Sequence, residues 1–123
     1  MRSGKVRFLV VSFTFAVCIM IIVSAFAIAA ETEQAIQVTA KRFEYSPKDI
    51  TVKKGVPVVL EFTSLDRLHG FNCPGLGIRT DIQPGKVNRL QFTPDKTGTF
   101  PFHCDNFCGT GHEGMRGSIT VTE

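Results

Sequence analysis

The sequence predicts an all-β sandwich that forms a single domain over residues 31–123, and two observations lead to this prediction. Apolar and polar residues alternate over several short stretches, as they do when one face of a strand is buried and the other lies in water. Turn signals that contain Gly or Pro separate the stretches, and none of the stretches shows the 3.6-residue period of an amphipathic helix. A segment of this length can enclose one hydrophobic core and leaves no room for a second domain.

The predicted strands follow each other along the whole domain. They comprise residues 36–40, 50–52, 56–63, 86–92, 99–104 and 117–122, with turn signals at 53–55, 84–85, 94–95 and 109–114. Side chains alternate along a strand, so Val58, Leu60 and Phe62 point to one face, which we expect in the core. Residues 69–74 form one more short apolar segment, which could be a strand next to residues 99–104.

Residues 1–30 have the features of an export signal. Arg2, Lys5 and Arg7 precede an apolar run over residues 8–30, and the run ends in small residues. The run is longer than the apolar region of most cleaved signals and long enough to span a bilayer as one helix. A cleaved signal peptide and a single membrane anchor therefore both remain open, and both place residues 31–123 in the periplasm or on the outer face of the cytoplasmic membrane.

The charges of the exported part are balanced. Of the 14 Lys and Arg residues, Arg2, Lys5 and Arg7 precede the apolar run, which leaves 11 basic residues against 11 acidic ones in residues 31–123. This balance excludes the basic stripe that nucleic acid or an anionic lipid surface requires. The sequence also has no paired nucleophile and base and no phosphate-binding loop, so we expect no catalysis by this chain alone. Asp66, Asp81 and Asp105 are expected in turns.

Four possible metal ligands lie within residues 104–115. Cys104, Cys108, His112 and Met115 have the spacing C-x-x-x-C-x-x-x-H-x-x-M. Thiolate and thioether sulfur favour copper, whereas a closed zinc site gains little from a thioether, so copper comes before zinc. Cys108, His112 and Met115 could form part of a single-copper site, which would leave Cys104 without a role. Two thiolates could instead bridge two copper ions, each with its own imidazole.

The second imidazole is expected to come from His69. In the predicted strand over residues 99–104, Phe102 and Cys104 share one face and His103 lies on the other, which favours a surface position for His103. His69 begins the apolar segment 69–74 and could face the loop of residues 104–115, which we call the ligand loop. Cys73 lies on the same face of that segment, and we expect it to be a small buried residue, with a sulfur near the metal as the alternative.

The distant His followed by C-x-x-x-C-x-x-x-H-x-x-M resembles the binuclear copper A (CuA) domain of cytochrome c oxidase subunit II and of nitrous oxide reductase, over residues 36–122. The resemblance implies a cupredoxin-like Greek-key β-sandwich or barrel, here preceded by one N-terminal apolar helix. It implies two copper ions that transfer one electron at a time, and a redox partner such as a c-type cytochrome or an oxidase or reductase subunit. The implied ligands are the side chains of His69, Cys104, Cys108, His112 and Met115 and the backbone carbonyl of Asn106.

The chain departs from that family in three respects. Asn106 stands where oxidase subunit II usually has a Glu that helps to hold magnesium, the chain has one apolar segment instead of a helix hairpin, and it contains no Trp. These departures indicate a relative of the oxidase subunit and not an ordinary oxidase subunit.

Several alternatives and supporting roles follow from the same residues. Four alternatives remain open: a mononuclear cupredoxin electron carrier, a periplasmic copper chaperone or storage protein on the same fold, a Cys104–Cys108 thiol switch and a zinc site. Phe102 and Phe107 are expected to be core residues that exclude water from the metal. Gly109, Gly111 and Gly114 would let the loop return to the site.

Overall fold

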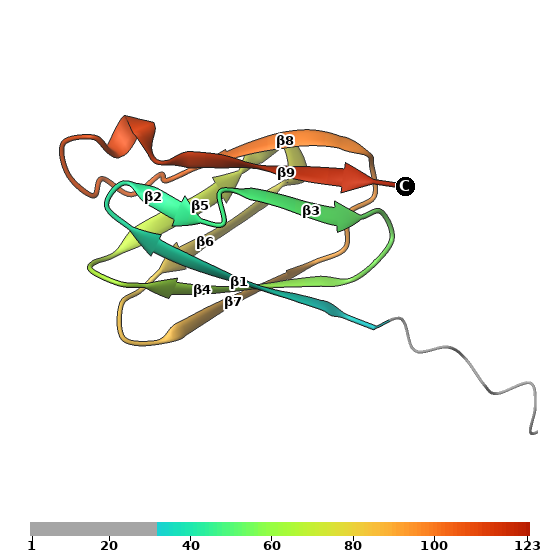
Figure 1. Ribbon diagram of the computed structural model, residues 1–123, viewed down its shortest axis with the longest axis horizontal. Helices are drawn as coiled ribbons and strands as arrows, with labels where there is room; N and C mark the ends of the chain where they lie inside the picture. The colour runs from blue at the N-terminus through green and yellow to red at the C-terminus, as the bar shows by residue number, and fades with distance from the viewer. Residues whose placement is uncertain (1–31) are drawn as a thin grey trace, which may run out of the picture. The chain divides into compact units, whose positions relative to one another are not determined.

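The computed structural model describes residues 32–123, which form two facing β-sheets (Figure 1). The predicted signal peptide or membrane anchor over residues 1–30, with its N-terminal helix, lies outside the described residues. Within residues 32–123, no helix has the length and hydropathy needed to cross a membrane.

Nine strands make up the two sheets. The four-stranded sheet has the order β2-β1-β4-β7, with β1 at Gln34–Lys41, β2 at Glu44–Ser46, β4 at Val58–Ser64 and β7 at Val87–Phe92. The five-stranded sheet has the order β3-β9-β8-β5-β6, with β3 at Asp49–Lys53, β5 at His69–Cys73, β6 at Ile78–Ile82, β8 at Gly98–His103 and β9 at Arg116–Thr122. Two 3₁₀ turns, η1 at Pro74–Leu76 and η2 at His112–Gly114, complete the described elements. β1 pairs with β4 and β3 with β9 in parallel, and the other pairs are antiparallel.

The all-β prediction and most predicted strands are confirmed. Strand β4 buries Val58, Leu60 and Phe62 completely, as the alternation of residues 56–63 indicated. Strand β5 also forms where the short apolar segment was noted, and it lies between β6 and β8. Two strands were missed: β2 has only three residues, and β6 is an edge strand with a single buried residue, Ile82.

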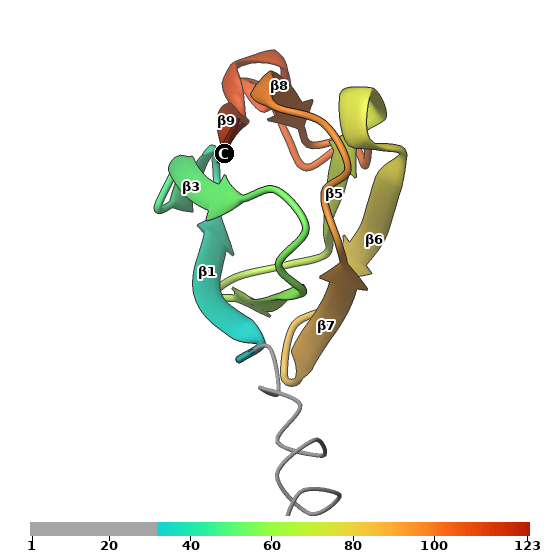
Figure 2. The ribbon, with the colours of Figure 1, turned by 90° about the vertical axis from the view of Figure 1, so that its right-hand side faces the viewer.

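The two sheets face each other (Figure 2), and an aromatic cluster belongs to the hydrophobic core between them. The ring of Phe71 from β5 lies 4.7 Å from that of Phe62 in the other sheet and 4.8 Å from that of Phe102, centroid to centroid. Tyr45 packs edge-on against Phe102 at 5.1 Å. Each ring removes a large apolar surface from water, so these four rings contribute much of the hydrophobic stabilisation. Cys104, Cys108 and Met115 belong to the same buried cluster.

Candidate metal centre

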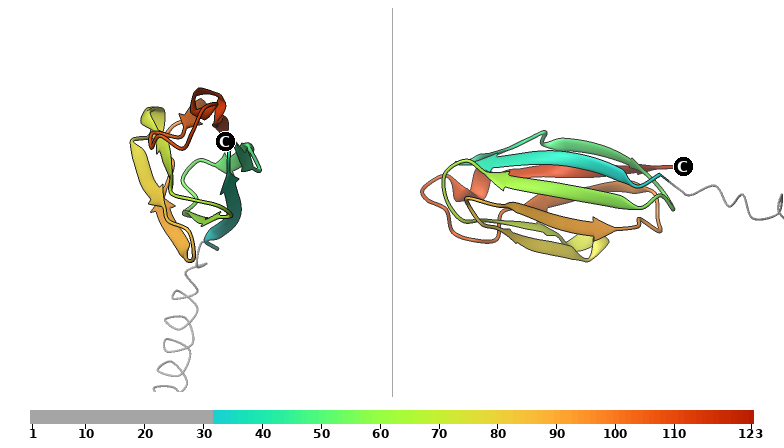
Figure 3. Two further views of the ribbon diagram at one scale, coloured as in Figure 1. Left: turned by 90° about the vertical axis from the view of Figure 1, so that its left-hand side faces the viewer. Right: turned by 90° about the horizontal axis from the view of Figure 1, so that it is seen from below.

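The predicted ligand residues meet at one end of the sandwich. The loop that joins β8 to β9, residues 104–115, turns back over the beginning of β5, and the C-terminus lies at the opposite end (Figures 1 and 3). One ligand atom each of His69, Cys104 and Cys108 lies within 4.8 Å of the other two, and all three residues are buried. The segments 69–73 and 99–104 are neighbouring strands, which explains how a residue distant in the sequence reaches the loop.

The two thiols are close but not bonded. Cys104 Sγ and Cys108 Sγ are 3.9 Å apart, and both cysteines are free. Cys104 Sγ donates to the backbone carbonyl of Asn106 at 3.1 Å. Cys108 Sγ lies 3.5 Å from His112 Nδ1 and 3.8 Å from Met115 Sδ. The structure thus brings together all six residues that the sequence analysis selected, with the Asn106 carbonyl turned toward the thiol of Cys104.

His69 has one ring nitrogen fixed and the other unpaired. Its Nε2 is 2.6 Å from Asp66 Oδ1, whereas its Nδ1 is buried and has no hydrogen-bond partner. A buried polar atom without a partner is costly, so such an atom indicates a missing ligand. A carboxylate on the far nitrogen is the usual arrangement behind a metal-binding imidazole, because it fixes the tautomer and the orientation of the ring. The donor set of sulfur and imidazole therefore fits copper, and His69 would bind it through Nδ1.

Asp66 links three segments around the site. Its Oδ2 accepts a hydrogen bond from the backbone amide of Arg42 at 2.8 Å, and its Oδ1 accepts from the amide of Arg67 at 2.7 Å as well as contacting His69. Desolvation opposes ionisation, but the hydrogen bonds from Arg42, His69 and Arg67 outweigh it and hold the pKa of this carboxyl at about 2. Asp66 is therefore a fixed anion at neutral pH.

A second polar network holds the side chain of Asn106. The side-chain amide of Asn106 donates to Asp81 Oδ1 at 2.9 Å and to the backbone carbonyl of His69 at 3.4 Å. Arg79 pairs with Asp81 at 2.7 Å and with Asp105 Oδ2 at 2.7 Å. The hydrogen bonds from Asn106 and Arg79 lower the pKa of Asp81. This network connects the ligand loop to β6 and leaves the main-chain carbonyl of Asn106 free to face Cys104.

Backbone groups next to the thiols are also fixed. The amide of Gly70 donates to Cys104 Sγ at 3.4 Å, and the carbonyl of Gly70 accepts from Tyr45 Oη at 2.5 Å. A Cβ at Gly70 would collide with the Asp105 carboxylate, so only glycine allows this close approach of strand and loop.

Burial and the nearby Cys104 raise the pKa of Tyr45. Burial and the neighbouring thiol raise the pKa of Cys108 to about 11, so a metal that binds here must displace its proton.

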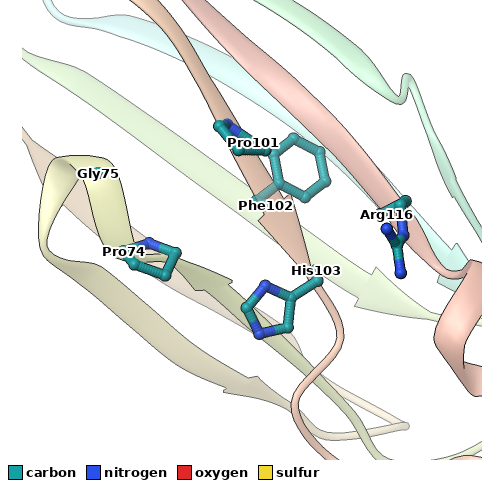
Figure 4. Close-up of a pocket in the computed structure, with 6 residues that line it drawn as sticks. All are labelled: Pro74, Gly75, Pro101, Phe102, His103 and Arg116. Atoms are coloured by element: carbon teal, nitrogen blue, oxygen red, sulfur yellow. The ribbon is translucent and has the colours of Figure 1, made fainter.

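His103 and Cys73 lie outside the group of ligand residues. His103 is exposed on the outer face of β8, where it lines a pocket of about 430 Å³ with Pro74 and Arg116 (Figure 4). Cys73 is buried, and its Sγ lies 3.8 Å from the carbonyl oxygen of Phe100. It stands four residues beyond His69 in the same strand, about 13 Å at ~3.3 Å per residue. The structure favours the interpretation of Cys73 as a small core residue.

Two other sequence interpretations need correction. Phe102 is buried as expected, but Phe107 is 73% exposed, because the loop after Cys104 does not continue the alternation of β8. The three acidic residues are more than turn residues: Asp81 lies within β6, and all three take part in the networks that hold the site. The spacing D-x-x-H from Asp66 to His69 is the sequence signal that could have identified the supporting carboxylate.

Comparison with known proteins agrees with this geometry. The model of the cupredoxin-like domain family matches residues 13–121. Cytochrome c oxidase subunit 2 of Thermus thermophilus is 35% identical over 91 residues, which cover 74% of this chain and 67% of that protein. A second subunit 2 sequence of the same species is also 35% identical over 91 residues, and the match covers 54% of its length.

Solved structures share the fold. The periplasmic domain of subunit II of cytochrome oxidase of Bradyrhizobium japonicum has a TM-score of 0.67 and 24% identity, over 73% of this chain and 84% of that one. The metal-binding domain of the Cu(I)-exporting P-type ATPase of Streptococcus pneumoniae, solved with Cu(I), has a TM-score of 0.59 and 28% identity, over 74% of this chain and 87% of that one. With its two-sheet sandwich and its buried group of one histidine and two cysteines, the chain belongs to the cupredoxin-like domain family and is a relative of cytochrome c oxidase subunit 2.

Proposed function

We propose that this chain is an exported copper protein whose binuclear CuA-type centre transfers single electrons. The observation that carries the proposal is the pair of unbonded thiols, 3.9 Å apart, with a histidine near each of them. A single-copper site uses one thiolate and would leave a second buried thiol without a role. The relationship to cytochrome c oxidase subunit 2 supports the same conclusion.

The contacts support a proposed role for each candidate ligand. Cys104 and Cys108 would bridge the two ions, while Nδ1 of His69 and Nδ1 of His112 would each bind one of them. The Met115 thioether and the Asn106 carbonyl would be weak outer ligands. When bound, the copper pair supplies a reversible one-electron redox centre. The protein keeps the ligands in place through the Asp66 and Arg79 networks and excludes water by burying both thiols and the Met115 side chain.

The location and partner of the protein are part of the same proposal. Residues 1–30 would export the chain as a signal peptide or hold it at the outer face of the membrane, and residues 31–123 would be the copper domain. Its partner would be a redox protein such as a c-type cytochrome or an oxidase or reductase subunit. We expect no catalysis by this chain on its own, since all donors in the site would be occupied by copper.

Copper handling is the second candidate function. It is favoured by the similarity to the metal-binding domain of the Cu(I)-exporting ATPase, at 28% identity on the same fold. A chaperone or store would hold Cu(I) through the same thiols and would release it to another protein, whereas an electron carrier would retain its copper through repeated redox cycles.

The deciding experiment is a copper count combined with electron paramagnetic resonance. Residues 31–123 are loaded with copper under reducing conditions and then oxidised by one electron. Two ions that share one unpaired electron would support the proposed centre. One localised copper would favour a mononuclear site, and a spectroscopically silent, readily exchanged ion would favour copper handling.

Substitutions of the ligands test the bridging arrangement. Cys104→Ser and Cys108→Ser should each abolish the shared-electron signal, because a serine hydroxyl does not replace a bridging thiolate. Met115→Leu should keep the signal and change the reduction potential, because the thioether is a weak ligand. His103→Ala is the matched control and should leave the signal unchanged, because His103 lies on the outer face. A normal signal in both Cys variants would contradict the bridging model.

A further inference from the structure

The two thiols of the candidate centre have different surroundings. Cys104 Sγ accepts a hydrogen bond from the backbone amide of Gly70 at 3.4 Å. Within residues 32–123, Cys108 Sγ contacts the side chains of Cys104, His112 and Met115, and no backbone amide is among its partners. An N–H group on a thiolate withdraws electron density from the sulfur, and hydrogen bonding around a cysteine sulfur adjusts the potential of a copper ion bound to it. The surroundings of Cys104 can therefore adjust the centre independently of Cys108.

The amide that faces Cys104 belongs to a peptide unit whose other end is held by Asn106. This unit joins His69 to Gly70, so its N–H is that of Gly70 and its carbonyl oxygen is that of His69. The carbonyl accepts a hydrogen bond from Asn106 Nδ2 at 3.4 Å, while the N–H donates to Cys104 Sγ. The side chain of Asn106 packs directly over the unit, since a Cβ on Gly70 would lie 3.2 Å from Asn106 Nδ2. Hydrogen bonds in a chain polarise one another, so the bond to the carbonyl makes the N–H a stronger donor to the sulfur.

The orientation of the Asn106 amide is fixed by the groups that accept from it. Asp81 Oδ1 lies 2.9 Å from Nδ2, and the lowered pKa of Asp81 keeps this carboxylate ionised, so it can only accept. The carbonyl of His69 can also only accept, so the amide nitrogen must face both groups. Arg79 in turn holds Asp81 at 2.7 Å. A flip of the Asn106 amide would break both of its hydrogen bonds.

We propose that the side chain of Asn106 is a positioning residue that sets the reduction potential of the centre through the His69–Gly70 peptide and the sulfur of Cys104. This inference rests on the proposed electron-transfer function, and it concerns the side-chain amide of Asn106, whereas the ligand role proposed above uses only its main-chain carbonyl. The sulfur is more negative when the copper pair is reduced, because Cu(I) takes less electron density from it. An N–H on this sulfur therefore stabilises the reduced state, and loss of the Asn106 amide should favour the oxidised state.

Two substitutions separate hydrogen bonding from shape. Leucine has the branched shape of asparagine without its N–H group, whereas glutamine is longer and keeps the amide. In the copper-loaded full chain at a fixed applied potential, Asn106→Leu should lower the ratio of reduced to oxidised centre by on the order of fivefold, about 40 mV for one electron. Asn106→Gln should recover more than half of this shift. A normal ratio in Asn106→Leu together with a changed ratio in Asn106→Gln would indicate a steric role and overturn the proposal.

The amide of Gly70 gives a second readout that requires no redox chemistry. Its hydrogen exchange is measured by NMR in the Cu(I)-loaded chain, and we expect Asn106→Leu to speed it up by on the order of tenfold. A changed ratio with unchanged exchange at Gly70 would mean that the substitution acts through the Asn106 carbonyl, which contradicts the proposed route. If Asn106→Leu does not fold, the wild-type chain still tests the proposal, because exchange at Gly70 as fast as at an exposed amide would overturn it.

Asn72→Leu is the matched control. Asn72 lies on β5, its side chain points to the outer face, and it forms no side-chain hydrogen bond within the described part of the chain. The same substitution there should change neither the ratio nor the exchange at Gly70, and an effect equal to that of Asn106→Leu would refute the specific role of Asn106. If the loaded chain shows no reversible one-electron couple, the proposed function itself fails and this inference fails with it. A couple that is identical in the wild-type chain and in Asn106→Leu overturns this inference alone.

Discussion

Asp66 shows how a single residue outside the ligand set can control the candidate site. Its carboxylate holds Nε2 of His69 and, through Arg42 and Arg67, fixes the turn and the loop beside it. With Nε2 held, only Nδ1 can turn toward the thiols. Asp66 is thus a positioning residue, and its effect should be visible in the metal site and not only in stability.

We predict that Asp66→Ala lowers copper affinity by about ten- to a hundredfold, the usual effect of removing the carboxylate behind a metal-bound imidazole. Affinity is measured by competition with a Cu(I) chelator. Asp95→Ala, at an exposed acidic residue in the β7–β8 connection, is the control and should bind copper like the wild-type chain. Unchanged affinity in Asp66→Ala would show that His69 needs no support.

Tyr45 provides a prediction of pH dependence. Burial raises its pKa above the usual value near ~10, so the folded chain retains the phenolic proton where the unfolded chain loses it. The unfolded state then binds fewer protons, and the free energy of unfolding should fall as the pH rises above about 10. Tyr45 is the only tyrosine and the chain has no Trp, so its ionisation can be followed by absorbance. Tyrosinate should form together with unfolding. Formation of tyrosinate at a lower pH than unfolding would contradict the raised pKa of Tyr45.

The candidate ligand residues could be selected from the sequence, whereas of their supports only Asp66 leaves a local signal, the D-x-x-H spacing to His69. The spacing of Cys104, Cys108, His112 and Met115 is local, and simple alternation placed His103 on the outside. The support by Asp66 depends on the amide of Arg42, 24 residues away. Phe107 was misjudged because burial within an irregular loop depends on tertiary packing and follows no period.

At the scale of elements, the ligand loop is shaped around the ring of Phe43. Gly109 and Gly111 both have positive φ, at 132° and 111°, and both approach that ring. A Cβ on Gly111 would lie 2.9 Å from two ring carbons, closer than carbon atoms pack. The loop therefore needs glycine at this position for its backbone and for its packing, and Phe43 acts as the support around which it turns.

We predict that Gly111→Ala destabilises the metal-free domain by about 1–3 kcal/mol, because it combines an unfavourable backbone angle with a steric clash. Thermal and denaturant unfolding measure this change. Gly114→Ala in the same loop is the matched control: Gly114 has no positive φ, and a Cβ there meets nothing within 4 Å. Equal stability of the two variants would contradict the role of Phe43 as a support.

The strands differ in how well the sequence revealed them. Central strands such as β4 bury an alternating face, and alternation is visible in the sequence. Strands β2 and β6 lie at sheet edges, and each buries one residue. Their existence depends on pairing with β1 and β5, which is a property of the tertiary fold.

At the scale of the whole molecule, copper binding should be coupled to stability. A ligand that binds only the folded chain adds RT ln(1 + [L]/Kd), about 2.7 kcal/mol at a hundredfold excess over Kd. We predict that Cu(I) raises the melting temperature of residues 31–123 and that Cys104→Ser loses most of this rise. Differential scanning calorimetry with and without Cu(I) measures both effects. An undiminished rise in Cys104→Ser would mean that copper stabilises the chain at another site.

The position of β9 has a consequence for the order in which the protein matures. β9 lies between β3 and β8, it follows β1 to β8 in the sequence, and the ligand loop immediately precedes it. During synthesis, β1 to β8 are therefore complete before the five-stranded sheet can close. Until β9 has inserted, the far end of the loop is not fixed and the two thiols stay open to solvent. Metal loading should thus follow the insertion of β9, and a chain that lacks this strand would be unable to hold the metal.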